Sequence, residues 1–278
     1  MMQEKPIFKP EYLSLTTLQL LIGYLPTDRI FSTATGFIYQ YEEKLFLITN
    51  WHNVSGRHPI TKEPLSKVHS GIPDVFITYL RLKDKNGQAR LTKIHLYNDE
   101  ESESPKWLIH PFYKEKVDVV AIPLSRDQDL WYYPINKCQF DDDIPPEVCD
   151  DVFVLGYPFE DLRELGLPIW KKGSIASDPF LNENQLPQIL IDTATRPGLS
   201  GSPVIFQRVG VHRMRDGQLQ ADTMFGRIRG FLGIYSGRIG IGEDMAQLGI
   251  VWKKNVIEEI IKGKVNGESI FNNDCQQT

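Results

Sequence analysis

Three side chains in this sequence have the types and the order that nucleophilic catalysis by a serine requires. The first is Ser200, which the segment 196–205 (RPGLSGSPVI) places between glycines and ahead of a proline and an apolar run. Glycines let backbone amides converge on one point, and an apolar run anchors such a loop on a strand. The loop is therefore suited to present a hydroxyl for attack on a carbonyl carbon.

A serine hydroxyl is a weak nucleophile at neutral pH, so it needs a base, and the base needs a group that fixes its tautomer. His52 ends the apolar run 45–51, where a strand gives way to a turn. Asp118 directly precedes the apolar run 119–122, which predicts a carboxylate at the mouth of a buried strand. His52 and Asp118 fall in the first half of the chain and Ser200 in the second, so we expect a site in the crevice between two halves.

The elements that must position these residues are mostly strands. Short apolar runs rich in Val, Ile, Phe and Tyr recur between turn residues, at 35–41, 45–49, 74–82, 89–96, 118–124, 152–155, 188–191, 204–206 and 230–235. This rhythm predicts an all-β sandwich or pair of barrels, and the Asn-Gly and Asp-Gly steps at 85–87 and 215–217 predict hairpin turns. One helix is expected near the end, from the helical spacing of Trp252, Val256, Ile257, Ile260 and Ile261 with Gly263 as its stop.

Changes in composition divide the chain into segments. The acidic stretch 99–105 predicts a solvated loop, and 137–151, with three consecutive aspartates and a proline pair, is too polar for a packed strand. We expect a lead segment at 1–29, a first β-barrel with His52 and Asp118 at 30–136, and a linker at 137–151. A second β-barrel with Ser200 follows at 152–250, and a C-terminal helix and tail at 251–278.

Composition excludes several classes of protein. The 278 residues suffice for a full hydrophobic core, and a formal charge of −5 gives no general attraction to nucleic acid or to anionic membranes. The three cysteines include no CxxC pair, which argues against a disulfide framework or a zinc ribbon. The sequence carries no secretion signal and no run of the roughly 18 apolar residues that a membrane span needs, so we expect a cytoplasmic protein.

The flanks of the three residues resemble the chymotrypsin-like serine proteases, most of all the bacterial glutamyl endopeptidases and the Deg-type proteases. ITNWHNV around His52 is similar to their histidine strand, VDVVAI around Asp118 to their aspartate strand, and DTATRPGLSGSP around Ser200 to their serine loop. TGF at 35–37, LGYP at 155–158 and GIYSG at 233–237 are similar to further strands of that family. The resemblance covers residues 30–262 and implies two six-stranded antiparallel β-barrels with a C-terminal helix.

The resemblance also implies a role for each residue of the site. Ser200 would attack the scissile carbonyl, His52 would take and return the proton, and Asp118 would orient His52. The backbone amides of Gly198 and Ser200 would form the oxyanion hole. The substrate-binding positions that it implies are Ala194, Thr195, Tyr235, Ser236 and Arg238.

Several positions depart from the family pattern. Ala194 takes the floor of the primary specificity pocket, so a trypsin-like preference for Lys or Arg is not expected. Tyr235 stands where glutamyl endopeptidases carry a pocket histidine, so a preference for acidic residues is not inherited, although Arg238 would supply a positive rim. Leu199 replaces the aspartate that pairs with a newly cut N-terminus, so no activation of that kind is expected.

Other motifs indicate no metal and no cofactor. His52, His58 and His69 lack the spacing with glutamate of a zinc helix, and the aspartates at 141–143 lack the glycine and glutamate of a calcium loop. The G-x-S-x-G pattern of another hydrolase fold fails because Ser202 holds its fifth position. No cysteine has the flanks of a catalytic thiol.

The segment 208–238 is unusually basic for an acidic chain. Its simplest interpretation is a solvated hairpin, and the alternative is an exosite for an acidic partner. The arginines concerned are Arg208, Arg213, Arg215, Arg227, Arg229 and Arg238.

Taken together, the residues and the resemblance predict a trypsin-like serine endopeptidase that cleaves protein or peptide substrates through an acyl-enzyme. A regulatory protein partner is possible, because the chain has no room for a fused sensor domain, whereas nucleic acid and membranes are not expected partners. The alternative, from a different class, is a catalytically silent protein that keeps the fold as a binding or signalling platform.

Overall fold

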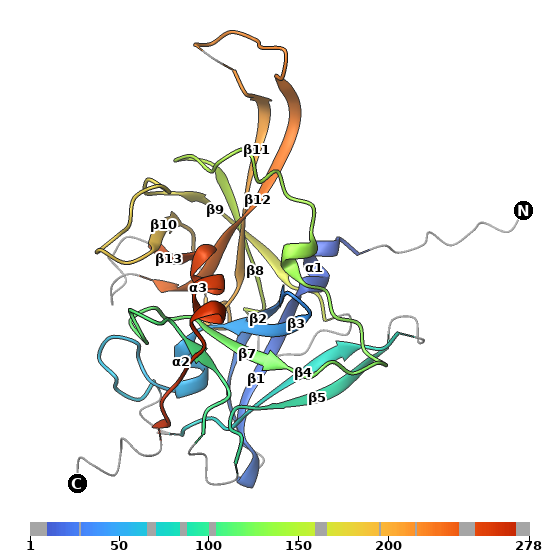
Figure 1. Cartoon of the computed structure of the whole chain (residues 1–278), viewed down its shortest axis with the longest axis vertical. Coiled ribbons are helices and arrows are strands. Elements are labelled where there is room, and N and C mark those ends of the chain that lie inside the picture. The colour runs from blue at the N-terminus through green and yellow to red at the C-terminus, as the bar shows by residue number, and fades with distance from the viewer. Residues whose placement is uncertain are drawn as a thin grey trace, which may run out of the picture.

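The chain forms two antiparallel β-sheets with short helices at their edges (Figure 1). This computed structural model describes residues 10–27, 29–65, 71–83, 88–99, 104–158, 166–194, 196–214, 216–238 and 248–270. The helices are α1 (Tyr12–Thr16), α2 (Trp51–Ser55) and α3 (Asn255–Gly263), and two short 3₁₀ turns lie at Leu25–Thr27 and Ile135–Lys137. The all-β prediction and the predicted C-terminal helix are therefore confirmed.

The first sheet has eight strands in the order β14-β6-β7-β3-β2-β1-β4-β5. Its most important pairing for the site joins β3 to β7, with Thr49 opposite Val120, because these residues lie within three positions of His52 and Asp118 in the sequence. The strands are β1 (Thr17–Tyr24), β2 (Arg29–Tyr41), β3 (Lys44–Thr49), β4 (Val75–Arg81), β5 (Ala89–His95), β6 (Leu108–Ile109), β7 (Val120–Leu124) and β14 (Val265–Asn266).

The second sheet closes into a six-stranded barrel in the order β10-β13-β12-β11-β8-β9. Closure removes the exposed edges of the sheet, so every strand of this unit is paired on both sides. The strands are β8 (Asp151–Gly156), β9 (Ile169–Ile175), β10 (Gln188–Asp192), β11 (Pro203–His212), β12 (Met224–Arg238) and β13 (Leu248–Lys253).

The strand count of the first unit differs from the expected six. Strand β1 lies in the expected lead segment, and its apolar residues Leu18, Leu20 and Ile22 alternate with a period of two and are buried in the core of the first sheet. Strand β14 lies in the expected tail and pairs with β6. Both ends of the chain therefore contribute to the first sheet, and the expected division at 137–151 stays a prediction.

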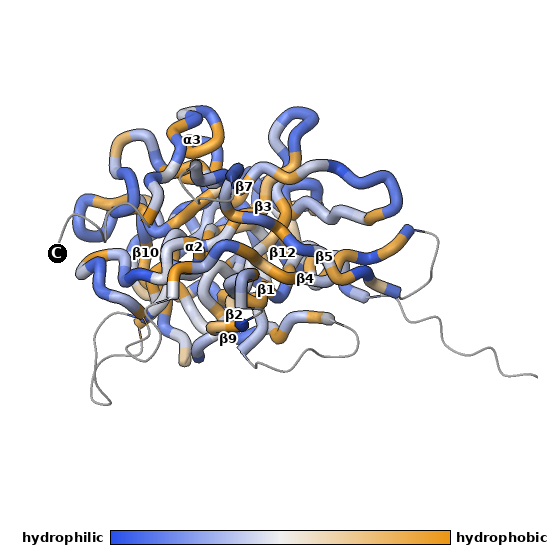
Figure 2. Tube along the Cα trace, turned by 90° about the horizontal axis from the view of Figure 1, so that it is seen from below, coloured by the Kyte–Doolittle hydropathy of each residue, from blue (hydrophilic) through white to orange (hydrophobic). Residues whose placement is uncertain are grey.

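Apolar side chains form three clusters, one of which holds the two sheets together. One lies on the first sheet, one fills the barrel, and the third lies between the two units. In the third cluster Phe37 of β2 meets Phe231 of β12 edge to face, with ring centroids 5.7 Å apart. Figure 2 shows apolar segments running through the strands near the centre of the molecule, while several peripheral loops are hydrophilic.

Helix α3 covers this shared core. Val256, Ile257, Ile260 and Ile261 form one apolar face, and all four side chains are buried. The helix ends at Gly263, as expected, and the left-handed residue that follows it is Lys264, whose N–H donates to the carbonyl of Ile260. A Cβ atom at Gly263 would lie 2.9 Å from the ring of Pro111, so close packing explains the glycine.

The long hairpin of β11 and β12 projects from the barrel (Figure 1). The expected turn at 215–217 lies on this hairpin, although Arg215 itself is outside the described residues, and the expected turn at 85–87 also falls outside them. Three arginines of the hairpin are held by acidic side chains of other segments: Arg208 by Asp150 and Glu147, Arg213 by Asp143, and Arg229 by Glu11. The acidic stretch 137–151 therefore supplies the counter-charge for Arg208 and Arg213, two of these three arginines.

Among the described residues, no helix is both long enough and apolar enough to cross a membrane.

Candidate active site

His52 and Asp118 lie side by side because the strands that carry them are paired. His52 is in α2, directly after β3, and Asp118 directly precedes β7, the partner of β3. The imidazole Nδ1 lies 2.7 Å from Asp118 Oδ2, and the backbone N–H of His52 donates to Asp118 Oδ1 at 2.9 Å. The carboxylate side chain is 1% exposed and the imidazole 12%, so the pair is shielded from water but open on one side.

Asp118 receives a further hydrogen bond from outside its own sheet. The hydroxyl of Ser236, on β12, donates to Asp118 Oδ2 at 2.5 Å, and the Asn50 side-chain amide donates to the backbone carbonyl of Asp118 at 2.7 Å. A neutral imidazole that donates from Nδ1 to Asp118 Oδ2 carries its lone pair on Nε2, which is then the ring nitrogen able to accept a proton.

Ser200 meets this pair through Ser236. The Ser200 hydroxyl donates to the backbone carbonyl of Ser236 at 3.2 Å, and the Ser236 hydroxyl contacts Asp118. The structure therefore brings residues 52, 118, 200 and 236 into one cluster, drawn from both sheets. The Ser200 hydroxyl faces a carbonyl here, and rotation about its Cα–Cβ bond changes the direction in which it donates.

The loop that carries Ser200 is held in an unusual backbone conformation. Gly198 and Gly201 have φ angles of +91° and +85°, which non-glycine residues rarely adopt. A Cβ atom at Gly198 would lie 2.3 Å from the carbonyl oxygen of Tyr157, and one at Gly201 would lie 2.1 Å from the carbonyl oxygen of Thr35. Both glycines are therefore required by close contact as well as by conformation.

Thr35 ties the serine loop to the first sheet. Its backbone N–H donates to the carbonyl of Ser200 at 2.9 Å, and its hydroxyl donates to the carbonyl of Gly198 at 2.7 Å. The Thr35 hydroxyl also accepts the backbone N–H of Tyr157 at 3.2 Å. Sequence analysis identified the segment that contains Thr35 but gave this residue no role.

These contacts occupy the carbonyl groups of Gly198 and Ser200 but not the amide groups of the same two residues. Within the described residues, the backbone N–H groups of Gly198 and Ser200 donate to no other group. The N–H groups of Gly198 and of Ser200 itself could together bind an oxyanion that forms on a carbonyl attacked by Ser200. The two amides are those that the sequence predicts for this purpose.

The expected substrate-binding residues have different surroundings. Ala194 is exposed just after β10, Arg238 is exposed at the end of β12, and Thr195 lies outside the described residues. Ser236 is buried, and both its hydroxyl and its carbonyl contact residues of the cluster described above.

The side chain of Tyr235 is 2% exposed and packs in the barrel core, and its expected role in substrate binding stays a prediction. Successive side chains of a strand point to opposite faces, so Tyr235 points into the barrel while Ser236 points toward Asp118. The ring fills the space above Gly249, where a Cβ atom would lie 2.7 Å from Tyr235 Cε2.

Two further kinds of reactive group can be assessed among the described residues, a buried thiol and clusters that could bind a metal. Burial, followed by the nearby charge of Glu11, raises the pKa of the Cys138 thiol to about 12, so it carries almost no thiolate at neutral pH. Within the described residues, no group of three or more His, Cys, Asp and Glu side chains is placed to hold a metal ion. The side chain of Leu199, in the serine loop, is buried in the barrel core.

Comparisons with known proteins give a limited result. No family model matches the chain, and no curated protein matches it. Among solved structures, the chain is similar to the protease Rv3671c in an inactive form, with 16% identity, a TM-score of 0.44 and 91% of each chain covered. It is also similar to a serine-to-alanine mutant of Rv3671c from M. tuberculosis H37Rv in an inactive form, with 17% identity, a TM-score of 0.43, and 90% of this chain and 86% of that chain covered.

Proposed function

We propose that this protein is a serine endopeptidase of the chymotrypsin-like kind, with Ser200 as nucleophile, His52 as general base and Asp118 as the group that orients His52. The observation that carries the proposal is the 2.7 Å contact between His52 Nδ1 and a buried carboxylate that Ser236 links to Ser200. Protein or peptide chains are the proposed substrates, and no step of the proposed reaction uses a metal or a cofactor.

The reaction begins with proton transfer from the Ser200 hydroxyl to His52 Nε2 as Oγ attacks the scissile carbonyl carbon. The carbonyl π electrons move onto oxygen, and the resulting oxyanion accepts hydrogen bonds from the amides of Gly198 and Ser200. Loss of one such donor typically costs about 3 kcal/mol of transition-state stabilisation. The imidazolium remains paired with Asp118, which stabilises its positive charge.

Collapse of the tetrahedral intermediate breaks the C–N bond of the substrate. The leaving amine takes the proton from His52 Nε2, and the acyl group stays on Ser200 Oγ as an ester. Water then attacks the ester with His52 as base, a second tetrahedral intermediate forms, and Ser200 leaves with the proton that His52 held. Both half-reactions use the same groups, so the proton balance closes at each turnover.

Substrate binding gives the Ser236 carbonyl a further role in this proposal. That carbonyl accepts the Ser200 hydroxyl at 3.2 Å, so a substrate N–H that bonded it instead would release the hydroxyl toward His52. Catalytic hydrogen bonds are often long or misdirected in unbound enzymes and form only with substrate present.

The alternative is a catalytically silent protein with the same fold. One observation favours it: the Ser200 hydroxyl donates to the backbone carbonyl of Ser236 and not to the imidazole of His52. Cleavage of a peptide library by the wild type, by Ser200→Ala and by Ser202→Ala separates the two proposals. Ser202 is a matched control, because it is buried two positions away and its hydroxyl has no hydrogen-bond partner among the described residues.

We expect cleavage by the wild type and by Ser202→Ala, and a loss of about 10⁴-fold or more in Ser200→Ala. A folded wild type that cleaves no peptide would support the silent platform. Cleavage that survives Ser200→Ala unchanged would contradict the assignment of the nucleophile. The cleavage sites would also test the expectation that exposed Ala194 gives no preference for Lys or Arg.

A further inference from the structure

The projecting hairpin of β11 and β12 carries an exposed apolar surface beyond the residues that pair with β8 and β13 (Figure 1). Val209 lies opposite Arg227 and Val211 lies opposite Phe225, so these four side chains share one face of the two-stranded ribbon, called here the hairpin face. Val209, Val211 and Phe225 are 70%, 41% and 71% exposed. Exposed apolar side chains that gather on one face indicate a surface that binds a partner.

The opposite face of the ribbon is already occupied. Successive side chains of a strand point to opposite faces, so Arg208 and its cross-strand neighbour Ile228 point away from the hairpin face. Arg208 pairs there with Asp150 and Glu147, and Ile228 is buried. The acids that hold Arg208 therefore do not cover the hairpin face.

The outer edge of β12 has backbone groups available along the same segment. Arg229 already uses this edge, because its N–H donates to Asp141 Oδ2 at 2.9 Å and its carbonyl accepts the N–H of Asp141 at 2.8 Å. The backbone groups of every second residue of a strand point to the same edge, so those of Arg227 and Phe225 point there too. Within the described residues these groups bond nothing else. An edge of this kind can pair with an extended chain.

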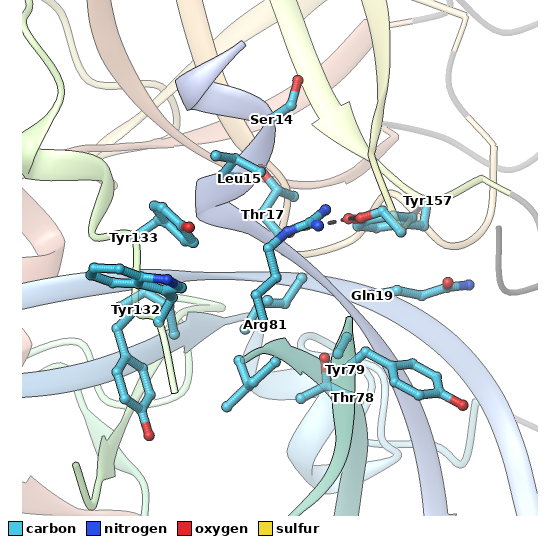
Figure 3. Close-up of a pocket in the computed structure, with 16 residues that line it drawn as sticks. Ser14, Leu15, Thr17, Gln19, Thr78, Tyr79, Arg81, Tyr132, Tyr133 and Tyr157 are labelled. Atoms are coloured by element: carbon cyan, nitrogen blue, oxygen red, sulfur yellow. Dashed lines mark hydrogen bonds between the residues drawn. The ribbon is translucent and has the colours of Figure 1, made fainter. Parts of the chain in front are cut away.

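Arg227 gives the hairpin face its charge. Its side chain is exposed and pairs with no carboxylate among the described residues, whereas three other arginines of the hairpin each pair with an acid of another segment. Arg81, which lines a cavity of about 360 Å³ beside β1 and β4, extends toward Tyr157 (Figure 3) and also has an interaction partner inside the chain. Arg227 is therefore suited to bind a carboxylate from outside the chain.

We propose that the hairpin face and the outer edge of β12 bind an extended acidic segment of another protein, which pairs with β12 as an additional strand. Side chains two positions apart in such a strand share a face, so a carboxylate beside Arg227 places the next side chain of that face beside Phe225. The motif that fits has an apolar and an acidic residue separated by one residue. Asp141 gives an example within the chain, because this acidic residue bonds both backbone groups of Arg229 at the same edge.

A second copy of this chain fits the hairpin face less well. Two copies related by a twofold axis would bring equivalent faces together. The hairpin face consists of Val209, Val211, Phe225 and Arg227, so each arginine would meet a face that contains no carboxylate. An acidic segment of a different protein supplies the counter-charge that a second hairpin face lacks.

Calorimetric titration with the peptide GSTFTETFTSG, acetylated and amidated at its ends, tests the role of charge. The alternation around its glutamate fits β12 in either strand direction, and the Ser200→Ala chain is used so that cleavage cannot consume the peptide. We expect this peptide to bind about 5-fold more tightly than its counterpart with glutamine, the upper range for an ion pair at a protein surface. Arg227→Gln should remove the difference, whereas Lys93→Gln, which removes an exposed cation from the edge strand β5, should keep it.

Two further comparisons test the apolar contact and the strand pairing. Phe225→Ser should weaken binding of both peptides about 10-fold, whereas Phe180→Ser, at a phenylalanine that is 70% exposed outside the hairpin, should not. N-methylation of the glutamate amide and of the next threonine amide should have opposite results. One version should lose binding and the other should keep it, because a strand presents only alternate amides to its neighbour.

The proposal is overturned if the folded chain does not bind the glutamate peptide, if the two peptides bind equally, or if both N-methylated versions bind alike. Self-association in analytical ultracentrifugation that Phe225→Ser abolishes would assign the face to a second copy. Binding to phosphatidylserine vesicles that the same variant abolishes would assign it to a membrane, and either result would overturn the proposal. None of these readouts depends on peptidase activity, so this inference and the proposed function fail separately.

Discussion

Asp118 is the residue at which the interactions of the site converge. Its carboxylate accepts hydrogen bonds from the backbone and the imidazole of His52 and from the hydroxyl of Ser236, and it is almost fully buried. Removing one hydrogen-bond donor from a buried carboxylate destabilises the folded protein, because water cannot reach the carboxylate to replace the lost hydrogen bond. The interaction with Ser236 is therefore the simplest one to test at the level of a single atom.

We expect Ser236→Ala to lower the free energy of unfolding by about 1.5–3 kcal/mol, the usual range for a hydrogen bond to a charged group. Ser202→Ala is the matched control, since it removes a buried hydroxyl that has no partner within the described residues. Urea denaturation of both variants measures the difference. Equal stability of the two variants would mean that the contact between Ser236 and Asp118 contributes nothing.

The three candidate catalytic residues are visible in the sequence at this scale, but their supporting contacts are not. His52, Asp118 and Ser200 each follow or precede an apolar run, which is visible in the sequence. The different surroundings of Tyr235 and Ser236 depend on which face of β12 each side chain occupies. A register shift between Tyr235 and Gly237 in the pairing of β12 with β13 also affects this region, and a sequence does not reveal it.

At the scale of elements, strand β2 determines the shape of the serine loop through Thr35. Thr35 bonds the carbonyls of both Gly198 and Ser200, and so joins a strand of the first sheet to a loop of the barrel. Sequence analysis missed this role because a threonine in a strand most often has only a packing function, and the bond spans 163 positions of the chain.

Thr35→Val removes the hydroxyl while keeping the shape of the side chain, so the hydrogen bond from Thr35 to the Gly198 carbonyl is lost. We expect the serine loop to be less firmly fixed as a result. Under the proposed function, kcat should fall about 10-fold or more with little change in KM, because the oxyanion donors act only in the transition state. Thr35→Ser should retain most of the activity. A fall of equal size in Thr35→Ser would indicate a loss of packing rather than of the hydrogen bond.

Helix α3 offers a test of how one element is attached. Glu258 accepts the hydroxyl of Tyr39 at 3.0 Å and pairs with Lys262 at 2.7 Å, and the Lys262 hydrogen bond is the main cause of its lowered pKa. A carboxyl whose folded pKa lies below its unfolded value stabilises the fold above that unfolded value, and the contribution disappears as the pH falls through the folded pKa.

We therefore expect Glu258→Gln to be less stable than the wild type at pH 7, with the difference closing as the pH falls below the ordinary glutamate pKa of 4.5. Chemical denaturation at several pH values between 3 and 7 measures it. A difference that stayed constant over this range would show that the charge of Glu258 is not involved.

At the scale of the whole molecule, the acidic stretch 137–151 joins the two sheets and also fastens the projecting hairpin. Arg208 bonds Asp150 through two nitrogen atoms at 2.6 and 2.7 Å, and the Asp150 side chain is 5% exposed. The sequence predicted the acidic stretch and the basic hairpin as separate features, and the structure shows three acids of the stretch paired with two arginines of the hairpin, Arg208 and Arg213. An exosite based on Arg208 or Arg213 would have to compete with these acids.

We expect Arg208→Ala to destabilise the protein by about 3 kcal/mol, because it leaves the Asp150 carboxylate buried without its cation. Arg227→Ala is the control, an exposed arginine of the same hairpin, and should change stability by less than about 0.5 kcal/mol. Thermal denaturation compares the two. An equal effect of both substitutions would argue against the role of the ion pair.

The extent of the first sheet is the part of the fold that the sequence did not reveal. The closed six-stranded barrel matches the expectation, whereas the first sheet gains β1 and β14 from segments near the two chain ends. Strand β14 has only two residues, which is too short for a periodic signal, and it forms because α3 delivers the chain to the edge of β6. Such an edge depends on tertiary packing and not on local propensity.

The central claim of this account is that Ser200 is a nucleophile activated by His52. A fluorophosphonate probe followed by mass spectrometry of the digested protein tests it directly, because the probe forms a stable phosphonate ester only with an activated serine hydroxyl. We predict one adduct, on Ser200, whose formation is lost in Ser200→Ala and in His52→Ala and is retained in Ser202→Ala. Absence of any adduct on the folded wild type, or an adduct on another residue, would contradict the account.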